Sequence, residues 1–144
     1  MNPVAAGLAV TRLGALKLND KAIGLIAGKN FGYLATTNKD GSPHVTPVWV
    51  DREGDLIVVN SIVGRTKVRN AKRNPKVAIA ITDASNQYNM VTYRGTVVAQ
   101  TTKGAAEHID KLYRKYIGKG KYTGDRRRII LKIRPEHYAE QWTT

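Results

Sequence analysis

The chain has 144 residues and no cysteine, which favours a single domain with one core and excludes disulfides, thiolate zinc sites and cysteine nucleophiles. Its 24 Lys and Arg against 11 Asp and Glu give a formal net charge of +13, which restricts the partner to nucleic acid, an anionic membrane surface or an acidic small molecule. The three histidines show no metal-ligand spacing and no apolar run is long enough to span a membrane, so we expect a cytoplasmic protein.

The chain is expected to begin with an arm and a short helix. Residues 1–18 have no clear hydrophobic period and are taken as an N-terminal arm, followed by a single domain at 19–144. Asn19 and Asp20 are suited to cap a helix, and Gly28 is suited to end it.

Three strands joined by tight turns come next and predict an antiparallel meander. Asp40 and Gly41 supply positive φ at low cost, which favours a hairpin between the first two strands. Pro47 lies inside the second strand but cannot donate to a sheet, so its position should be irregular or at an edge, with neighbouring backbone groups free to bind a ligand. The strands are expected at 31–37, 43–50 and 55–62.

The second half predicts a basic helix, two strands, another helix and a last strand. Pro75 ends the basic helix, and Gly95 interrupts a long strand where a bulge or bend is expected. Thr102 is suited to cap a helix whose apolar stripe reaches Tyr116. The basic helix is expected at 66–74, the strands at 76–82, 88–100 and 128–133, and a tail at 137–142.

Six short strands with two or three peripheral helices indicate a mainly β, α+β domain that forms a small antiparallel barrel.

Residues 58–70, VVNSIVGRTKVRN, contain the clearest candidate site. A predicted strand leads into a polar turn at Asn60 and Ser61, and Arg65 and Lys67 then open the basic helix. A strand end that brings two cations and free helix amides together is suited to bind an anion. Considered alone, the same two cations would more often belong to a solvated helix face.

Three parts of the chain carry a resemblance to a known family. They read FGYLATTNKDGSPHVTPVWV (31–50), VVNSIVGRTKVRNAKRNPKVAI (58–79), and TYRGTV (92–97) with the later DRRRIILKIRPEHYAEQW (125–142). Their order and spacing resemble the pyridoxamine 5′-phosphate oxidase-like superfamily and, within it, the coenzyme F420 (deazaflavin)-dependent oxidoreductases of flavin/deazaflavin oxidoreductase group B. The resemblance implies a six-stranded split β-barrel of the FMN-binding type and a homodimer with cofactor clefts along the interface.

The resemblance also implies roles for individual residues. Arg65 and Lys67 would bind the cofactor phosphate, since Arg offers a fork of donors and Lys a compact charge. Two of the implied contacts also have a purely structural interpretation: Trp49 as a core aromatic and Tyr88 as an interface residue. The other implied cofactor contacts are Asn60 and Ser61 beside the phosphate, Thr66 and Asn70 at the helix start, Thr46, Pro47, Val48 and Trp49 along the flavin-like ring, and Tyr88 and the run from Arg126 to Arg128 from the neighbouring subunit.

The implied function is hydride transfer between coenzyme F420 and an unidentified small organic acceptor. One alternative keeps the fold and exchanges the cofactor for FMN, as an oxidase or reductase. A nucleic-acid-binding module would also use the positive charge, although no RNP, KH or zinc-finger pattern is present. A cofactor carrier without turnover is a further alternative. The strongly acidic deazaflavin suits a basic cleft better than FMN does.

Overall fold

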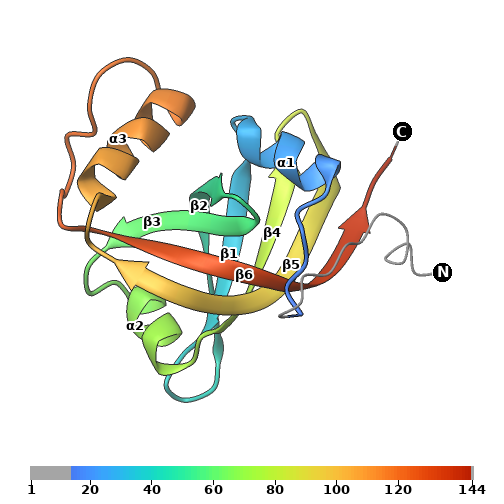
Figure 1. The fold of residues 1–144 in the computed structure, drawn as a ribbon, viewed down its shortest axis with the longest axis horizontal. Helices are drawn as coiled ribbons and strands as arrows, with labels where there is room; N and C mark the ends of the chain where they lie inside the picture. Colours follow the sequence, from blue (N-terminus) through green and yellow to red (C-terminus); the bar gives the residue numbers. More distant parts are fainter. Residues whose placement is uncertain (1–13, 144) are drawn as a thin grey trace.

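The computed structural model describes residues 14–143, in which six strands form one closed antiparallel barrel (Figure 1). The strands follow the order β1-β2-β3-β6-β5-β4 around the barrel, and three helices lie at its periphery. The predicted α+β barrel is therefore confirmed. The elements are α1 (Asp20–Ala27), β1 (Phe31–Thr37), β2 (Pro43–Glu53), β3 (Leu56–Ile62), α2 (Thr66–Arg73), β4 (Lys76–Asp83), β5 (Asn86–Thr101), α3 (Ala105–Tyr116) and β6 (Arg128–Gln141).

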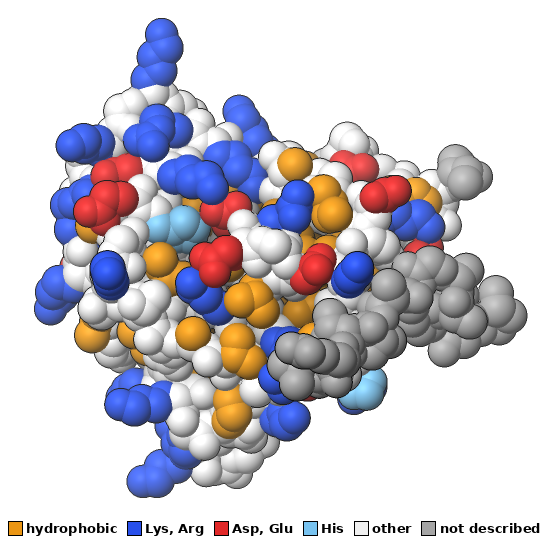
Figure 2. Space-filling view, viewed as in Figure 1, with side chains coloured by type: hydrophobic (Ala, Val, Ile, Leu, Met, Phe, Trp, Pro, Cys, Tyr) orange, Lys and Arg blue, Asp and Glu red, His pale blue; other side chains and the backbone are white. Residues whose placement is uncertain are grey.

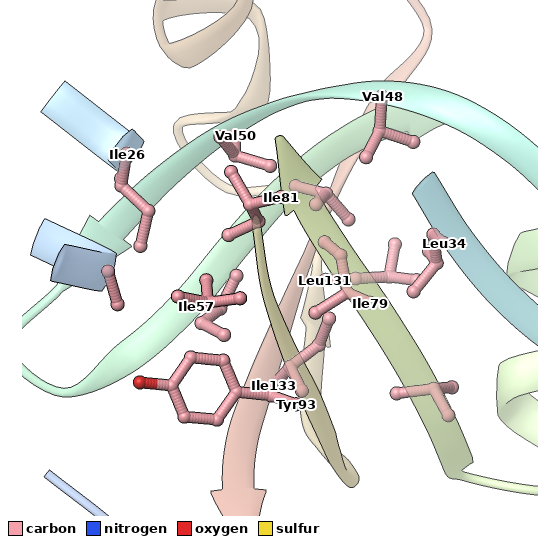
Figure 3. Close-up of a cluster of buried hydrophobic side chains, with 14 of the residues drawn as sticks. Ile26, Leu34, Val48, Val50, Ile57, Ile79, Ile81, Tyr93, Leu131 and Ile133 are labelled. Atoms are coloured by element: carbon pink, nitrogen blue, oxygen red, sulfur yellow. The ribbon is translucent and has the colours of Figure 1, made fainter. Parts of the chain in front are cut away.

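Aliphatic side chains fill the interior of the barrel (Figure 3). Successive residues of a strand point to opposite faces, so alternate positions such as Leu34, Ile79 and Leu131 are fully buried while their neighbours point outward. Burial of each such side chain contributes about 1.5–3 kcal/mol. None of the helices within residues 14–143 is long and apolar enough to cross a membrane.

Helix α1 covers one end of the barrel (Figure 1). The Asn19 side chain accepts a hydrogen bond of 2.9 Å from the amide of Ala22, which confirms the predicted cap. Leu16 and Leu18, from the expected arm, are buried in the same core, and the Leu16 amide donates to the carbonyl of Pro135. The packed structure thus includes residues before 19, while residues 1–13 of the arm lie outside the described residues.

The helix after Thr102 is confirmed as α3, but its predicted cap and the predicted tail at 137–142 were wrong. Helix α3 is capped by Gly104, at φ +75°, and the Thr102 carbonyl instead accepts from the Ala105 amide in the preceding turn. The predicted tail at 137–142 is largely strand, because β6 continues along β5 as far as Gln141. This pairing is between distant segments, and no aliphatic run marks it in the sequence.

The predicted irregularity at Gly95 is confirmed. The pairing of β5 with β6 shifts register between Arg94 and Gly95, so that one residue of β6 is skipped. A Cβ atom at position 95 would lie 2.1 Å from the carbonyl oxygen of Arg134. Glycine therefore allows the two backbones to approach at this bulge.

The barrel is split between β2 and β3. These strands pair only at one end, as far as Val50 and Val59, whereas residues 43–49 of β2 pair with β1 alone. Pro47 lies opposite Tyr33 in this one-sided segment, as its missing N–H predicts. The other edge of the segment makes no ladder with a described strand, so its backbone groups face the split.

Candidate functional site

A cleft of about 630 Å³ opens where β2 and β3 separate. β1 and β2 form one wall, the end of β3 and the start of α2 form another, and α3 and the start of β6 complete it. Seven of the predicted site residues line this cleft. They are Pro47, Val48, Trp49, Asn60, Ser61, Arg65 and Lys67.

Three cations converge on the cleft: Arg65, Lys67 and Arg128. Burial lowers the pKa of Lys67, and the charges of Arg65 and Arg128 lower it further. Burial also lowers the pKa of Arg128. Within residues 14–143, neither Arg65 nor Lys67 forms an ion pair or a side-chain hydrogen bond. Like charges held together without an acid favour the binding of an anion.

The start of α2 adds backbone donors to this cluster. Gly64, at φ +89°, turns the chain into the helix, and Arg65 occupies the cap position without a side-chain cap hydrogen bond. The amides of Thr66 and Lys67 donate to no described carbonyl outside the helix. Free amides at a helix start carry partial positive charge and suit a phosphate oxygen. Thr66 itself does not belong to the cleft lining, although it lies between two residues that do, Arg65 and Lys67.

Trp49 belongs to an aromatic stack that connects the cleft wall to α3. Its ring stacks on Tyr116 with centroids 5.1 Å apart, and Phe31 stacks on the same tyrosine at 6.0 Å. The Tyr116 hydroxyl donates to the Asn30 carbonyl and accepts from the Val50 amide, and burial raises its pKa to about 12. Trp49 thus both packs against the helix and lines the cleft.

The other five predicted site residues lie outside the cleft lining: Thr46, Thr66, Asn70, Tyr88 and Arg126. The Asn70 side chain donates to Thr36 and Asn38, and so fastens α2 to β1. Thr46 neighbours the cleft on β2, and its buried hydroxyl has no hydrogen-bond partner among the described residues. Tyr88 is 70% exposed near the start of β5 and does not belong to the cleft lining.

Arg126 is held away from the cleft by an acidic partner. Its guanidinium makes two hydrogen bonds to the Asp110 carboxylate, of 2.9 and 3.0 Å, and also donates to the Tyr122 carbonyl. This hydrogen bonding lowers the pKa of Asp110 to about 2. The Arg126 charge is therefore balanced within the same chain.

Arg128 and Tyr122 are cleft residues that the sequence did not single out individually. The Arg128 guanidinium lies over the Tyr122 ring, 5.1 Å from its centroid, and its Nε donates to Asn60 Oδ1 at 2.8 Å. Gly124 leaves room for that ring, because a Cβ atom there would lie 2.3 Å from the Tyr122 hydroxyl. The sequence offered one signal for Arg128: it is the member of the three-arginine run that lies at the start of a strand.

Many Lys and Arg side chains lie over α3 and toward α2, with some Asp and Glu side chains among them (Figure 2). Because α2 and α3 both border the cleft, these cations lie on two sides of it. Such a field attracts an anionic ligand and raises its rate of association.

Comparison with known proteins agrees with this architecture. The family model described as "Pyridoxamine 5'-phosphate oxidase" matches residues 18–142. The chain is similar to a solved F420 reductase, with 30% identity and a TM-score of 0.73 over 81% of this chain and 94% of that chain.

Two further solved structures share the fold at lower identity. A conserved hypothetical protein from Mycobacterium tuberculosis is 19% identical, with a TM-score of 0.68 over 94% of this chain and 87% of that chain. General Stress Protein 26 from Bacillus anthracis is 17% identical, with a TM-score of 0.64 over 91% of this chain and 95% of that chain. Since the family model spans nearly all of the described residues, the chain belongs to the pyridoxamine 5′-phosphate oxidase family.

Proposed function

We propose that the protein is a coenzyme F420-dependent oxidoreductase that transfers a hydride between the deazaflavin and a small organic acceptor. The observation that carries the proposal is the convergence of Arg65, Lys67 and Arg128 on one cleft. Similarity to an F420 reductase supports the broader class, a flavin- or deazaflavin-type oxidoreductase. The strong positive charge favours the more acidic of these cofactors.

The residues present fit such a cofactor. Arg65, Lys67 and Arg128 would hold its phosphate, together with the free amides at the start of α2. The segment from Pro47 to Trp49, on the open edge of β2, would supply apolar surface and backbone groups to the planar ring. The cofactor supplies hydride chemistry when bound, and the protein supplies binding, orientation and exclusion of water.

The cleft shows no acid–base pair. None of its lining side chains within residues 14–143 is Asp, Glu or His. We therefore expect any proton that the reaction requires to come from solvent.

Side-by-side titrations with F420 and FMN test the proposal. We expect a colourless purified protein that quenches deazaflavin fluorescence with micromolar or better affinity and oxidises reduced F420 when an acceptor is supplied. A yellow protein with flavin absorbance would instead favour an FMN oxidase or reductase. Binding of F420 without turnover across a panel of acceptors would indicate a carrier. Salt-sensitive DNA binding without cofactor affinity would favour the nucleic-acid module.

We also propose that the protein is a homodimer whose interface adjoins the cleft. The outer face of β2, β1 and β4 presents a neutral patch of small and apolar side chains, in which Ala35 lies between Val45 and Ala78. Val45 is 62% exposed. The neighbouring pair of Tyr33 and Pro47 belongs both to this face and to the cleft lining. A second copy on this face would therefore stand beside the cofactor.

Replacing Val45 with Glu should convert the dimer to a monomer, because it places a charge at the centre of a desolvated surface. Analytical ultracentrifugation measures the change. Val98→Glu is the matched control, since Val98 is an exposed valine of β5 outside this patch. The interface is refuted if Val45→Glu sediments as wild type does.

A further inference from the structure

The orientation of the Asn60 side chain is fixed from both of its ends. Its Oδ1 accepts from the Nε of Arg128 at 2.8 Å, and its Nδ2 donates to the Ala105 carbonyl at 2.9 Å. A guanidinium can only donate and a carbonyl can only accept, so a flipped amide would lose both bonds. Asn60 therefore presents an N–H to its third neighbour, the Nδ1 of His108, at 3.0 Å.

This arrangement determines the tautomer of His108. Its Nδ1 must accept from Asn60, so the hydrogen of the neutral ring lies on Nε2. That Nε2 donates to Asp51 Oδ2 at 3.0 Å, and the Lys111 ammonium donates to the same oxygen at 3.0 Å. A directed chain of hydrogen bonds thus runs from Arg128 through Asn60 and His108 to Asp51.

This chain of hydrogen bonds ends at the negatively charged carboxylate of Asp51. Burial raises the pKa of Asp51, but hydrogen bonds from His108 and Lys111 outweigh it and hold this pKa well below its usual value. The side chains of His108 and Asp51 are only 12% and 18% exposed, so their contact is shielded from competing water. The carboxylate can therefore hold the imidazole in one orientation.

We propose that His108 and Asp51 are positioning residues that hold the Arg128 guanidinium at the cleft as a third ligand for a phosphate-type anion. Arg128 lies near two other cations and has no acidic partner for its guanidinium among the described residues. The Tyr122 ring, 5.1 Å from the guanidinium, and the Asp125 carbonyl, which accepts from Nη1 at 3.4 Å, also contact this side chain, but repulsion and rotamer freedom still favour its departure. The hydrogen bond from Arg128 to Asn60 opposes that movement.

The inference rests on the proposed function only for the identity of the cofactor. Inorganic phosphate is therefore the probe, observed by NMR through the Nε–H signal of Arg128 in nitrogen-15-labelled protein. In the wild type, we expect the His108 ring to show the neutral Nε2–H tautomer and phosphate to shift the Arg128 signal.

Two substitutions separate positioning from simple structural support. His108→Leu removes the acceptor for Asn60, whereas His108→Asn keeps an oxygen near the place of Nδ1; neither keeps the ring between Asn60 and Asp51. We expect His108→Leu to lose the protected Arg128 Nε–H signal and to weaken phosphate binding roughly tenfold, as loss of an orienting partner does at other sites. His108→Asn should recover part of that affinity, because its carboxamide can still accept from Asn60 although the link to Asp51 is lost. His137→Leu, on an exposed residue of β6, should bind phosphate as wild type does.

Several results would overturn the inference. Equal phosphate affinity in His108→Leu and wild type would do so, as would a wild-type Arg128 signal that phosphate does not shift. If His108→Leu fails to fold, the tautomer of His108 in the wild type tests the inference instead. An Nδ1–H ring or an imidazolium at neutral pH would contradict the hydrogen-bond chain. If the phosphate results hold while the wild type binds no F420, the inference stands and the proposed function fails.

Discussion

Lys67→Ala should weaken the binding of coenzyme F420 by about 10- to 150-fold without reducing the stability of the protein. Hydrogen bonds to charged groups contribute about 1.5–3 kcal/mol, which corresponds to this loss of affinity. The pKa of Lys67 is lowered by burial and by the charges of Arg65 and Arg128, so its ammonium is less favourable in the folded protein than in the unfolded chain. Removing it relieves that cost. Fluorescence titration measures the affinity and thermal unfolding measures the stability.

Lys72→Ala is the matched control for this variant. Lys72 lies in the last turn of the same helix, is exposed, and does not line the cleft. Lys72→Ala and Lys67→Ala lower the net charge by the same amount, so any general effect of charge on F420 affinity appears in both variants. Equal affinities in the two variants would contradict the assignment of Lys67 to the phosphate site.

Gly95→Ala should destabilise the barrel by about 3 kcal/mol or more, at or above the upper end of what overpacking usually costs. The new Cβ would lie 2.1 Å from the Arg134 carbonyl oxygen and 3.2 Å from the Pro135 Cα. Both atoms belong to the backbone of β6, so no rotamer change can relieve the contact. The two strands would have to separate at the bulge, with loss of ladder hydrogen bonds. Urea unfolding monitored by circular dichroism measures the effect.

Replacing Gly24 with alanine should have the opposite effect and stabilise the protein. Gly24 lies within α1, and a Cβ atom there would meet nothing within 4 Å. Alanine is favoured over glycine in a helix by about 0.8–1 kcal/mol, so Gly24→Ala should be more stable than wild type. If Gly24→Ala and Gly95→Ala unfold at the same urea concentration, the close approach at the bulge does not limit stability.

Local signals were sufficient for most of the fold. Asp40 and Gly41 marked the first hairpin, Asn19 marked the start of α1, and Pro47 marked the one-sided part of β2. One error was local, since Gly104 and not Thr102 caps α3. The other error lay where distant pairing decides. The end of β6 forms a strand because β5 is long enough to pair with it, and its polar sequence carries little local preference for a strand.

The site was predictable to the extent that the chain itself brings its residues together. Asn60, Ser61, Arg65 and Lys67 follow one another through a strand end and a helix start, and all of them line the cleft. Arg128 comes from β6, which reaches the site only because it pairs with β3. Arg126, only two residues earlier, is instead bound by Asp110 and does not line the cleft. The sequence does not reveal that contact.

The one-sided segment of β2 also has a consequence for solubility. A strand with an unpaired edge can act as a template for strands of other molecules and so promote aggregation. Pro47 interrupts the row of amide donors along this edge, because it has no N–H. The proline that belongs to the cleft wall therefore also protects the protein against edge-to-edge association.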